Sequence, residues 1–149
     1  MKWFEAITSL DELKAEYKRL CKIHHPDLGG DTATMQQINA EYAKKLMCLD
    51  LGKSTVEIEN AIMDIIQATT IYQGLTVELC GNWVWFTGAT RQWKDQLKAL
   101  GCYFSSKKAA WYWRPAEYKH HGKSAASLEE IRSKYGSRIF ANQEREVLA

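Results

Sequence analysis

The chain has 149 residues and a formal net charge of +2; 46% of its residues are hydrophobic and 26% are charged. These values are typical of a soluble globular protein with one ordinary domain or two small ones. Because no apolar run is long enough to cross a bilayer, the sequence excludes a membrane-spanning protein.

The first predicted element is a basic amphipathic helix that begins after Ser9. Ser9 and Glu12 have the spacing of a capping box, which marks a helix start. Apolar side chains then recur at three- and four-residue intervals, as expected for one buried face: Leu10, Leu13, Tyr17, Leu20 and His24. At 100° per residue, three lysines share a flank of that face, which we call the basic ridge: Lys14, Lys18 and Lys22. Glu12 and Glu16 point to the far side.

The tripeptide His25-Pro26-Asp27 follows this helix directly. Pro26 ends the helix because it lacks an N–H and keeps the preceding residue out of the α region. His25 and Asp27 are therefore expected in a turn at the end of the basic ridge, and Gly29-Gly30 lets the chain reverse. This arrangement indicates a docking surface rather than an active site.

A second helix is predicted after the loop, with Asp31 or Thr32 as its N-cap. Its apolar face consists of Met35, Ile38, Tyr42, Leu46 and Leu49. Two apolar faces joined by a short loop predict an antiparallel helical hairpin.

This hairpin resembles the J domain of DnaJ-type co-chaperones. Residues 17–20, followed after four residues by the His-Pro-Asp tripeptide, match the second helix and loop of that family, and the positions that resemble its third helix are Met35, Ile38, Asn39 and Tyr42. The Gly-Gly-Asp loop is particularly similar to the J domains of viral tumour antigens, which hints at a phage or mobile-element origin. The resemblance covers residues 3–49. It departs from the pattern at both ends, because only residues 3–7 stand in the place of a first helix and no fourth helix with a basic motif follows.

The resemblance implies that the loop aspartate and the basic helix bind a DnaK-type heat-shock chaperone and stimulate its ATPase. By position, these roles fall to Lys18, Arg19, Lys22, His25, Pro26 and Asp27. Lys14 joins them as part of the basic ridge.

A boundary is predicted near residues 51–54. Ser54 and Glu57 form another capping box, and a third helix ends before Gly74. Its buried face consists of Ile58, Ile62, Ile65, Ile66 and Tyr72. We expect this helix to pack on the hairpin or to bridge to the following segment, and it could substitute for the missing first helix.

From Leu75 onward the apolar residues alternate, as they do in strands. Two strands, residues 75–79 and 83–87, are joined by the turn Gly81-Asn82. A helix capped by Thr90 follows, then strands near residues 102–104 and 110–113, and a last helix begun by Ser127. The predicted unit is a small ββαββα domain with a mainly antiparallel sheet.

The predicted fold class is therefore α+β. The segments are a J-like helical domain (1–51), a linking helix (52–74), a small tryptophan-rich basic domain (75–140) and a tail (141–149). The first 74 residues carry a charge of about −3 and the remainder about +5.

The basic half offers a second candidate surface. Trp83 and Trp85 share one face of their strand, and Trp111 and Trp113 share one face of theirs. If those faces are open, they form with three cations a surface for stacking and phosphate binding, suited to single-stranded nucleic acid, an RNA or a client protein: Lys107, Lys108 and Arg114. If the last helix covers them, the tryptophans are core residues. The segment also resembles a small domain of uncharacterised plasmid, conjugative-element and phage proteins, through residues 81–85, 91–101, 105–113 and 127–139, with no activity to transfer.

Neither catalysis, nor a cofactor, nor a metal site is predicted. The four cysteines are widely spaced, which favours core thiols: Cys21, Cys48, Cys80 and Cys102. His120-His121 has no ligand partners at suitable spacing, and Gly122-Lys123-Ser124 lacks the earlier glycine of a P-loop. No nucleophile and base occur in the context that an enzyme needs.

The leading hypothesis is a cytoplasmic co-chaperone or adaptor, since the N-terminus lacks a signal-peptide pattern. Its first half would recruit and activate the chaperone, and its second half would recognise a client or a nucleoprotein complex. The alternative is a nucleic-acid-binding or host-defence-inhibiting accessory protein of a phage or mobile element that uses the J-like fold as a scaffold.

Overall fold

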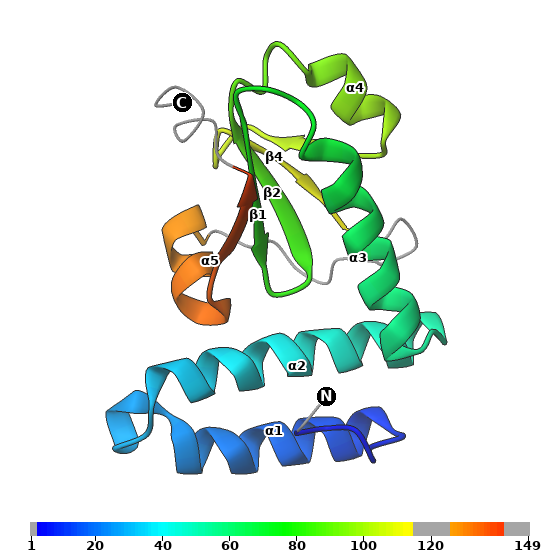
Figure 1. The fold of residues 1–149 in the computed structure, drawn as a ribbon. Helices are drawn as coiled ribbons and strands as arrows, with labels where there is room; N and C mark the ends of the chain where they lie inside the picture. The colour runs from blue at the N-terminus through cyan, green and yellow to red at the C-terminus, as the bar shows by residue number, and fades with distance from the viewer. Residues whose placement is uncertain (1–2, 115–125, 142–149) are drawn as a thin grey trace.

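The computed structural model describes residues 3–114 and 126–141. It begins with two antiparallel helices, α1 (Leu10–His24) and α2 (Thr32–Leu51), joined by the short 3-10 helix η1 (Pro26–Leu28) (Figure 1). The side chain of Ser9 accepts a hydrogen bond from the N–H of Glu12, and that of Asp31 accepts one from Thr34. The predicted hairpin and its two caps are confirmed, with Asp31 rather than Thr32 at the second.

Phe4 closes the core of the hairpin from the segment that precedes α1. Its side chain is 1% exposed and packs with four residues of the two helices: Leu13, Leu20, Met35 and Ile38. The N–H of Trp3 donates to Oε2 of Glu41 on α2 at 3.0 Å, which holds the segment in place. A short segment of bends and a turn thus covers the hairpin core without forming a helix.

Helix α3 (Thr55–Thr69) begins with the predicted capping box of Ser54 and Glu57. Its four isoleucines are buried against one face of the sheet, in a core that includes Leu75, Val77, Val84 and Phe86. The bridging expectation is therefore confirmed, whereas α3 contributes no buried residue to the hairpin core that a first helix would cover. Tyr72 lies beyond the end of α3 but is partly buried against the same core, and it stacks on Trp93 with ring centroids 4.8 Å apart.

Within the described residues, five strands form one antiparallel sheet in the order β3-β4-β2-β1-β5. Their bounds are β1 (Leu75–Cys80), β2 (Trp83–Gly88), β3 (Tyr103–Ser105), β4 (Ala110–Trp113) and β5 (Arg138–Ala141). The α+β class is confirmed, but the predicted ββαββα order omits β5. This strand has four residues and lacks clear alternation, and it forms only by pairing with β1, about 60 positions earlier in the sequence.

Two further helices flank the sheet. Helix α4 (Lys94–Ala99) starts after Trp93, so Thr90 is not its N-cap; the carbonyl of Thr90 accepts from the N–H of Trp93 in the preceding turn. Helix α5 (Leu128–Tyr135) is capped by Ser127 as predicted. Figure 1 shows α3 on one side of the sheet and α5 on the other.

An ion pair with a buried carboxylate links α5 and β5 to the sheet. Glu78 on β1 accepts hydrogen bonds from Nε and Nη2 of Arg132 at 2.6 and 2.8 Å, and a third from the hydroxyl of Ser137. Glu78 is 2% exposed, so these donors replace its water.

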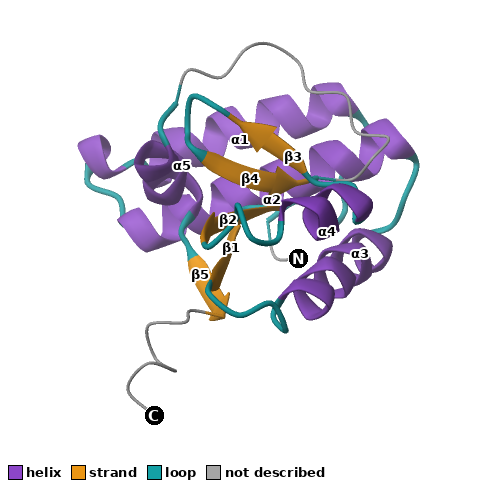
Figure 2. Ribbon diagram, turned by 90° about the horizontal axis from the view of Figure 1, so that it is seen from above, coloured by secondary structure: helices purple, strands orange, loops and turns teal. Residues whose placement is uncertain are grey.

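Helix α2 contacts both the hairpin core and the sheet. Met47 and Cys48 belong to the core under α3. The side chains of Gln36 and Asn39 donate to the carbonyls of Ser133 and Lys134 at the end of α5, each at 2.9 Å. Figure 2 shows α1 and α2 side by side next to the sheet. The C-terminal helix is thus seated on the hairpin.

Three of the four cysteine thiols are buried and all four are free, as the spacing predicted: Cys48, Cys80 and Cys102 are buried, and Cys21 is partly exposed. Burial raises the pKa of Cys80 and of Cys102 to about 12, so both remain protonated at neutral pH. Among the described residues, no helix is long and apolar enough to cross a membrane.

Candidate functional site

The loop after α1 displays Asp27 to solvent. His25 caps α1 in an extended conformation, and its Nδ1 accepts a hydrogen bond from the N–H of Asp27 at 3.1 Å. That bond uses the backbone of Asp27. The side chain of Asp27 is 89% exposed, and its Oδ2 lies 3.7 Å from Nδ1 of His25. The loop thus presents an accessible negative charge beside His25.

Gly30 allows the loop to return tightly against the end of α1. A Cβ atom at this position would lie 2.0 Å from the carbonyl oxygen of His24, and the N–H of Gly30 donates to the carbonyl of His25 at 3.0 Å. Gly29 adopts the left-handed conformation, with φ of +88°, but a Cβ there would meet nothing within 4 Å. The two glycines are therefore required for different reasons.

We expect Gly30→Ala to lower the free energy of unfolding by about 2–3 kcal/mol, because the backbone of His24 must move away. Gly29→Ala is the control and should cost about 1–2 kcal/mol, the strain of a left-handed alanine alone. Urea unfolding of the two variants measures the difference. A smaller loss for Gly30→Ala than for Gly29→Ala would contradict the close approach.

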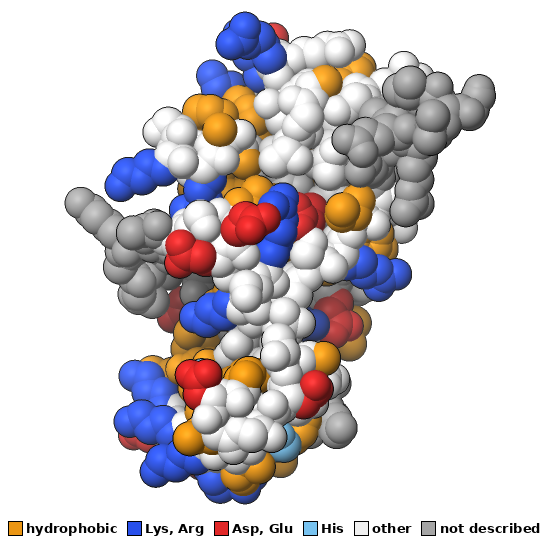
Figure 3. Space-filling view, turned by 90° about the vertical axis from the view of Figure 1, so that its left-hand side faces the viewer, with side chains coloured by type: hydrophobic (Ala, Val, Ile, Leu, Met, Phe, Trp, Pro, Cys, Tyr) orange, Lys and Arg blue, Asp and Glu red, His pale blue; other side chains and the backbone are white. Residues whose placement is uncertain are grey.

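The basic ridge lies on the exposed side of α1 and leads to this loop. Lys14, Lys18 and Lys22 are all exposed, whereas the guanidinium of Arg19 is paired with Glu16. Lys and Arg side chains gather on one side of the hairpin in the lower part of Figure 3. The structure therefore brings the predicted chaperone-binding residues together on one surface, although the charge of Arg19 is partly neutralised.

A cavity of about 450 Å³ separates the loop from the end of α5. It is lined on one side by Tyr17, His25 and Asp27 and on the other by Ser133 and Lys134. The hydroxyl of Tyr17 hydrogen-bonds to Oδ1 of Asn39, and burial, together with nearby Cys21, raises the pKa of this phenol. No sequence pattern predicted this neighbourhood, because it depends on how α5 packs against α2.

The sheet divides the four predicted tryptophans between its two faces. Strand β4 pairs with β2 so that Trp111 lies opposite Phe86, Tyr112 opposite Trp85, and Trp113 opposite Val84. Trp111 and Trp113 consequently pack as core residues under α3, whereas the core alternative expected the last helix to cover them. The last helix packs against Trp85 instead, through Leu128 and Ile131. The single stacking surface made by all four tryptophans is therefore not formed.

Trp83, Trp85 and Tyr112 form an aromatic cluster on the opposite face. The ring centroids of Trp83 and Tyr112 are 5.2 Å apart with an interplanar angle of 15°, and those of Trp83 and Trp85 are 6.1 Å apart. Tyr112 was missed as a functional candidate. Its only signal in the sequence was its position between two tryptophans, which places it on the other side of the strand.

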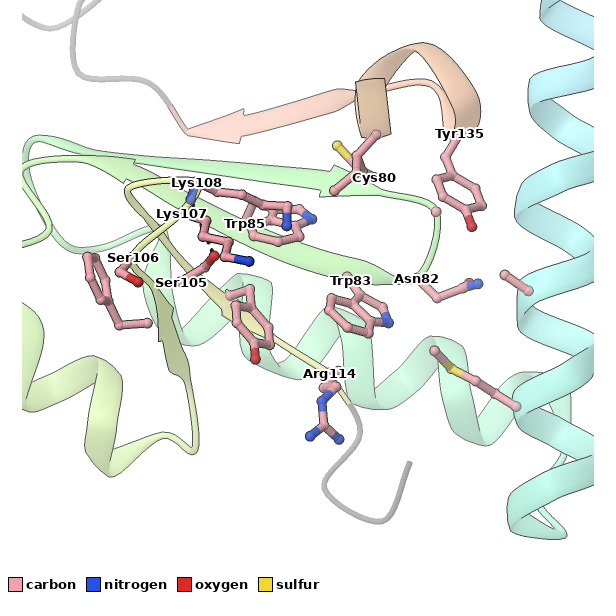
Figure 4. A pocket seen from close by; sticks show the side chains of 16 residues that line it. Cys80, Asn82, Trp83, Trp85, Ser105, Ser106, Lys107, Lys108, Arg114 and Tyr135 are labelled. Carbon is pink, nitrogen blue, oxygen red and sulfur yellow. Dashed lines mark hydrogen bonds between the residues drawn. The ribbon is translucent and has the colours of Figure 1, made fainter. Parts of the chain in front are cut away.

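The three predicted cations surround this cluster (Figure 4). Lys107 and Lys108 lie in the turn between β3 and β4, and Arg114 directly follows β4. Together with the cluster they line a cavity of about 550 Å³, which also contacts α2 and α5. Five of the seven predicted contact residues thus meet at one site: Trp83, Trp85, Lys107, Lys108 and Arg114.

In the described part of the chain, no three His, Cys, Asp or Glu residues form a group that could bind a metal ion. His120-His121 and the Gly122-Lys123-Ser124 segment lie outside the described residues, as do residues 142–149 of the predicted tail.

No family model matches the chain, and neither the curated proteins nor the solved structures contain a match. The function must therefore be argued from the two surfaces that these residues build.

Proposed function

We propose that this chain is a J-domain-like co-chaperone or adaptor that binds a DnaK-type heat-shock chaperone and stimulates its ATPase. The observation that carries the proposal is the exposed carboxylate of Asp27, on a loop shaped by His25 and Gly30 at the end of the basic ridge. An exposed carboxylate on a hydrogen-bonded loop suits a directional, charge-assisted hydrogen bond to an arginine of a partner.

The basic ridge supports the same interaction through long-range electrostatics. Three lysines spaced four residues apart lie within about 12 Å along the helix, since each residue adds about 1.5 Å. Such a row attracts an acidic groove during encounter and loses this attraction as salt rises. The ridge would thus set the rate and register of docking, and Asp27 would supply the specific contact.

Charge reversal of the ridge should weaken binding to the chaperone. We expect Lys18→Glu with Lys22→Glu to raise the Kd at least tenfold at low salt, because two attractive charges become repulsive. The matched control is Lys94→Glu with Lys98→Glu on α4, which changes the net charge equally at exposed positions away from the loop. Titration at two salt concentrations measures both effects. Equal weakening by the two double variants would contradict a specific role of the ridge.

The C-terminal half would then recognise the client or a nucleoprotein complex. Its support is the seating of α5 on α2 through Gln36 and Asn39, beside the loop that carries Asp27. A client held by the second half would therefore be kept at a fixed distance from the docked chaperone.

A further inference from the structure

We propose that the cavity bounded by Trp83, Trp85 and Tyr112 binds single-stranded nucleic acid, with a base against the aromatic cluster and phosphates at Lys107, Lys108 and Arg114. This inference is independent of the chaperone interaction. It uses a different cavity from the one that Asp27 lines, and either activity can fail without the other.

Two buried polar groups in the lining have no hydrogen-bond partner among the described residues. Trp85 is 3% exposed and its indole N–H is unsatisfied; Asn82 is 2% exposed and its Oδ1 is unsatisfied. The amide nitrogen of Asn82 donates to the carbonyl of Ala40 at 3.2 Å, which fixes the orientation of its side chain. Unsatisfied buried groups are costly, so an unsatisfied donor and an unsatisfied acceptor in the lining indicate a ligand that carries polar groups of its own.

The edge of a nucleobase carries donors and acceptors, so a base can satisfy one of these two groups. The side chain of Lys108 covers Trp85 in the free protein, with Nζ 5.9 Å from the ring centroid. A phosphate that attracts this flexible lysine would draw it off the indole and open the wall to the base. The same side chain thus links recognition of the phosphate to access for the base.

Charge favours an anionic ligand. The described lining contains Lys107, Lys108 and Arg114 but neither aspartate nor glutamate. Stacked indole and phenol rings bind any base through its π face, with an expected contribution of about 1–3 kcal/mol per base. The combination of cations and stacked rings fits a base with its phosphate better than an acidic peptide, whose carboxylates would use only the cations.

The positions of the cations favour a single-stranded polynucleotide over a single nucleotide as the ligand. Lys107 and Lys108 precede β4, whereas Arg114 follows it, so positive charge stands at both ends of this strand. The guanidinium of Arg114 lies 5.2 Å from the ring centroid of Tyr103, and this ring continues the row at 5.6 Å from Tyr112. A row of aromatic rings with a cation at each end can contact more than one base and more than one phosphate. A polynucleotide offers both, whereas a single nucleotide does not.

Fluorescence anisotropy with a labelled 12-nucleotide single-stranded DNA and the same RNA sequence tests the site. We expect Lys107→Glu with Lys108→Glu to weaken binding of at least one strand by tenfold or more, and to lower the slope of log Kd against log salt by about 0.7 per lost phosphate contact. Lys94→Glu with Lys98→Glu is the charge-matched control and should change Kd less than threefold. Trp83→Ala, checked for folding by circular dichroism, should weaken binding without altering the salt slope.

Competition with AMP, with duplex DNA and with a polyglutamate peptide defines the ligand. The proposal is supported if unlabelled single-stranded nucleic acid displaces the label at a concentration at least tenfold lower than each other competitor requires. The proposal would be overturned if no single strand binds at low salt, or if the two lysine pairs have equal effects on Kd. It would also be overturned if the site prefers AMP, duplex DNA or the peptide.

Discussion

Replacing Arg132 with alanine should lower the free energy of unfolding by about 3–5 kcal/mol, the typical cost of leaving a buried charge without its partner. Glu78 is 2% exposed and relies on two hydrogen bonds from Arg132. Burial alone would raise the pKa of Glu78, but the hydrogen bonds from Arg132 and Ser137 outweigh it and hold that pKa below its ordinary value of 4.5. Without Arg132 the buried carboxylate keeps only the hydroxyl of Ser137 and the thiol of Cys80 as side-chain donors.

The pKa of Glu78 determines how the free energy of unfolding should change with pH. Because the pKa of Glu78 is lowered by folding, its contribution to stability is present above pH 4.5 and is lost as the pH falls through the pKa of the folded state. In Arg132→Ala, burial dominates and the pKa of Glu78 rises. The difference in the free energy of unfolding between this variant and the natural chain should therefore become smaller as the pH falls. Urea unfolding at pH 7 and pH 5 measures this.

Two variants control for other effects of Arg132. Arg138→Ala removes a neighbouring arginine that is exposed and should change stability by less than about 1 kcal/mol. Adding Glu78→Gln to Arg132→Ala should recover part of the loss, because the buried charge is gone. A stability of Arg132→Ala within 1 kcal/mol of the natural chain at pH 7 would show that the ion pair does not fix α5.

Asp27→Asn should abolish stimulation of the chaperone ATPase while leaving stability unchanged. The backbone N–H of Asp27, which asparagine keeps, makes the hydrogen bond to His25, and the exposed side chain tolerates the change. Asparagine cannot form the charged hydrogen bond with a partner arginine. A hydrogen bond to a charged group contributes about 1.5–3 kcal/mol, so stimulation should fall at least tenfold.

Asp50→Asn is the matched control, since Asp50 is exposed near the opposite end of α2. It makes the same change in charge and should retain full stimulation. Full stimulation by Asp27→Asn would refute the role of the loop carboxylate. A loss shared by both variants would assign the effect to net charge rather than to the loop.

Helices and their starts could be predicted because the signals are local. Ser9, Asp31, Ser54 and Ser127 each accept a hydrogen bond from a residue three positions later, so a short window of sequence contains the whole interaction. The loop of His25 and Asp27 was predictable for the same reason, since Pro26 alone ends the helix. Thr90 failed as a cap because the chain makes one more turn before α4.

The faces of the sheet could not be predicted from the strands alone. Alternation shows that Trp111 and Trp113 share a face, but only the pairing of Trp113 with Val84 decides that this face is the one under α3. Strand β5 and the seating of α5 on Asn39 likewise depend on contacts about 60 and 95 positions apart. The aromatic cavity arises from those contacts, so its lining became visible only in three dimensions.

Co-chaperone function is tested by single-turnover ATP hydrolysis by a bacterial DnaK-type chaperone, measured with and without the full chain. We expect a rate at least several-fold above that of the chaperone alone. The rate should saturate with added protein, and the increase should be lost in Asp27→Asn but not in Asp50→Asn. An unchanged rate at saturating concentrations of the natural chain would contradict a co-chaperone function for the exposed loop and the basic ridge.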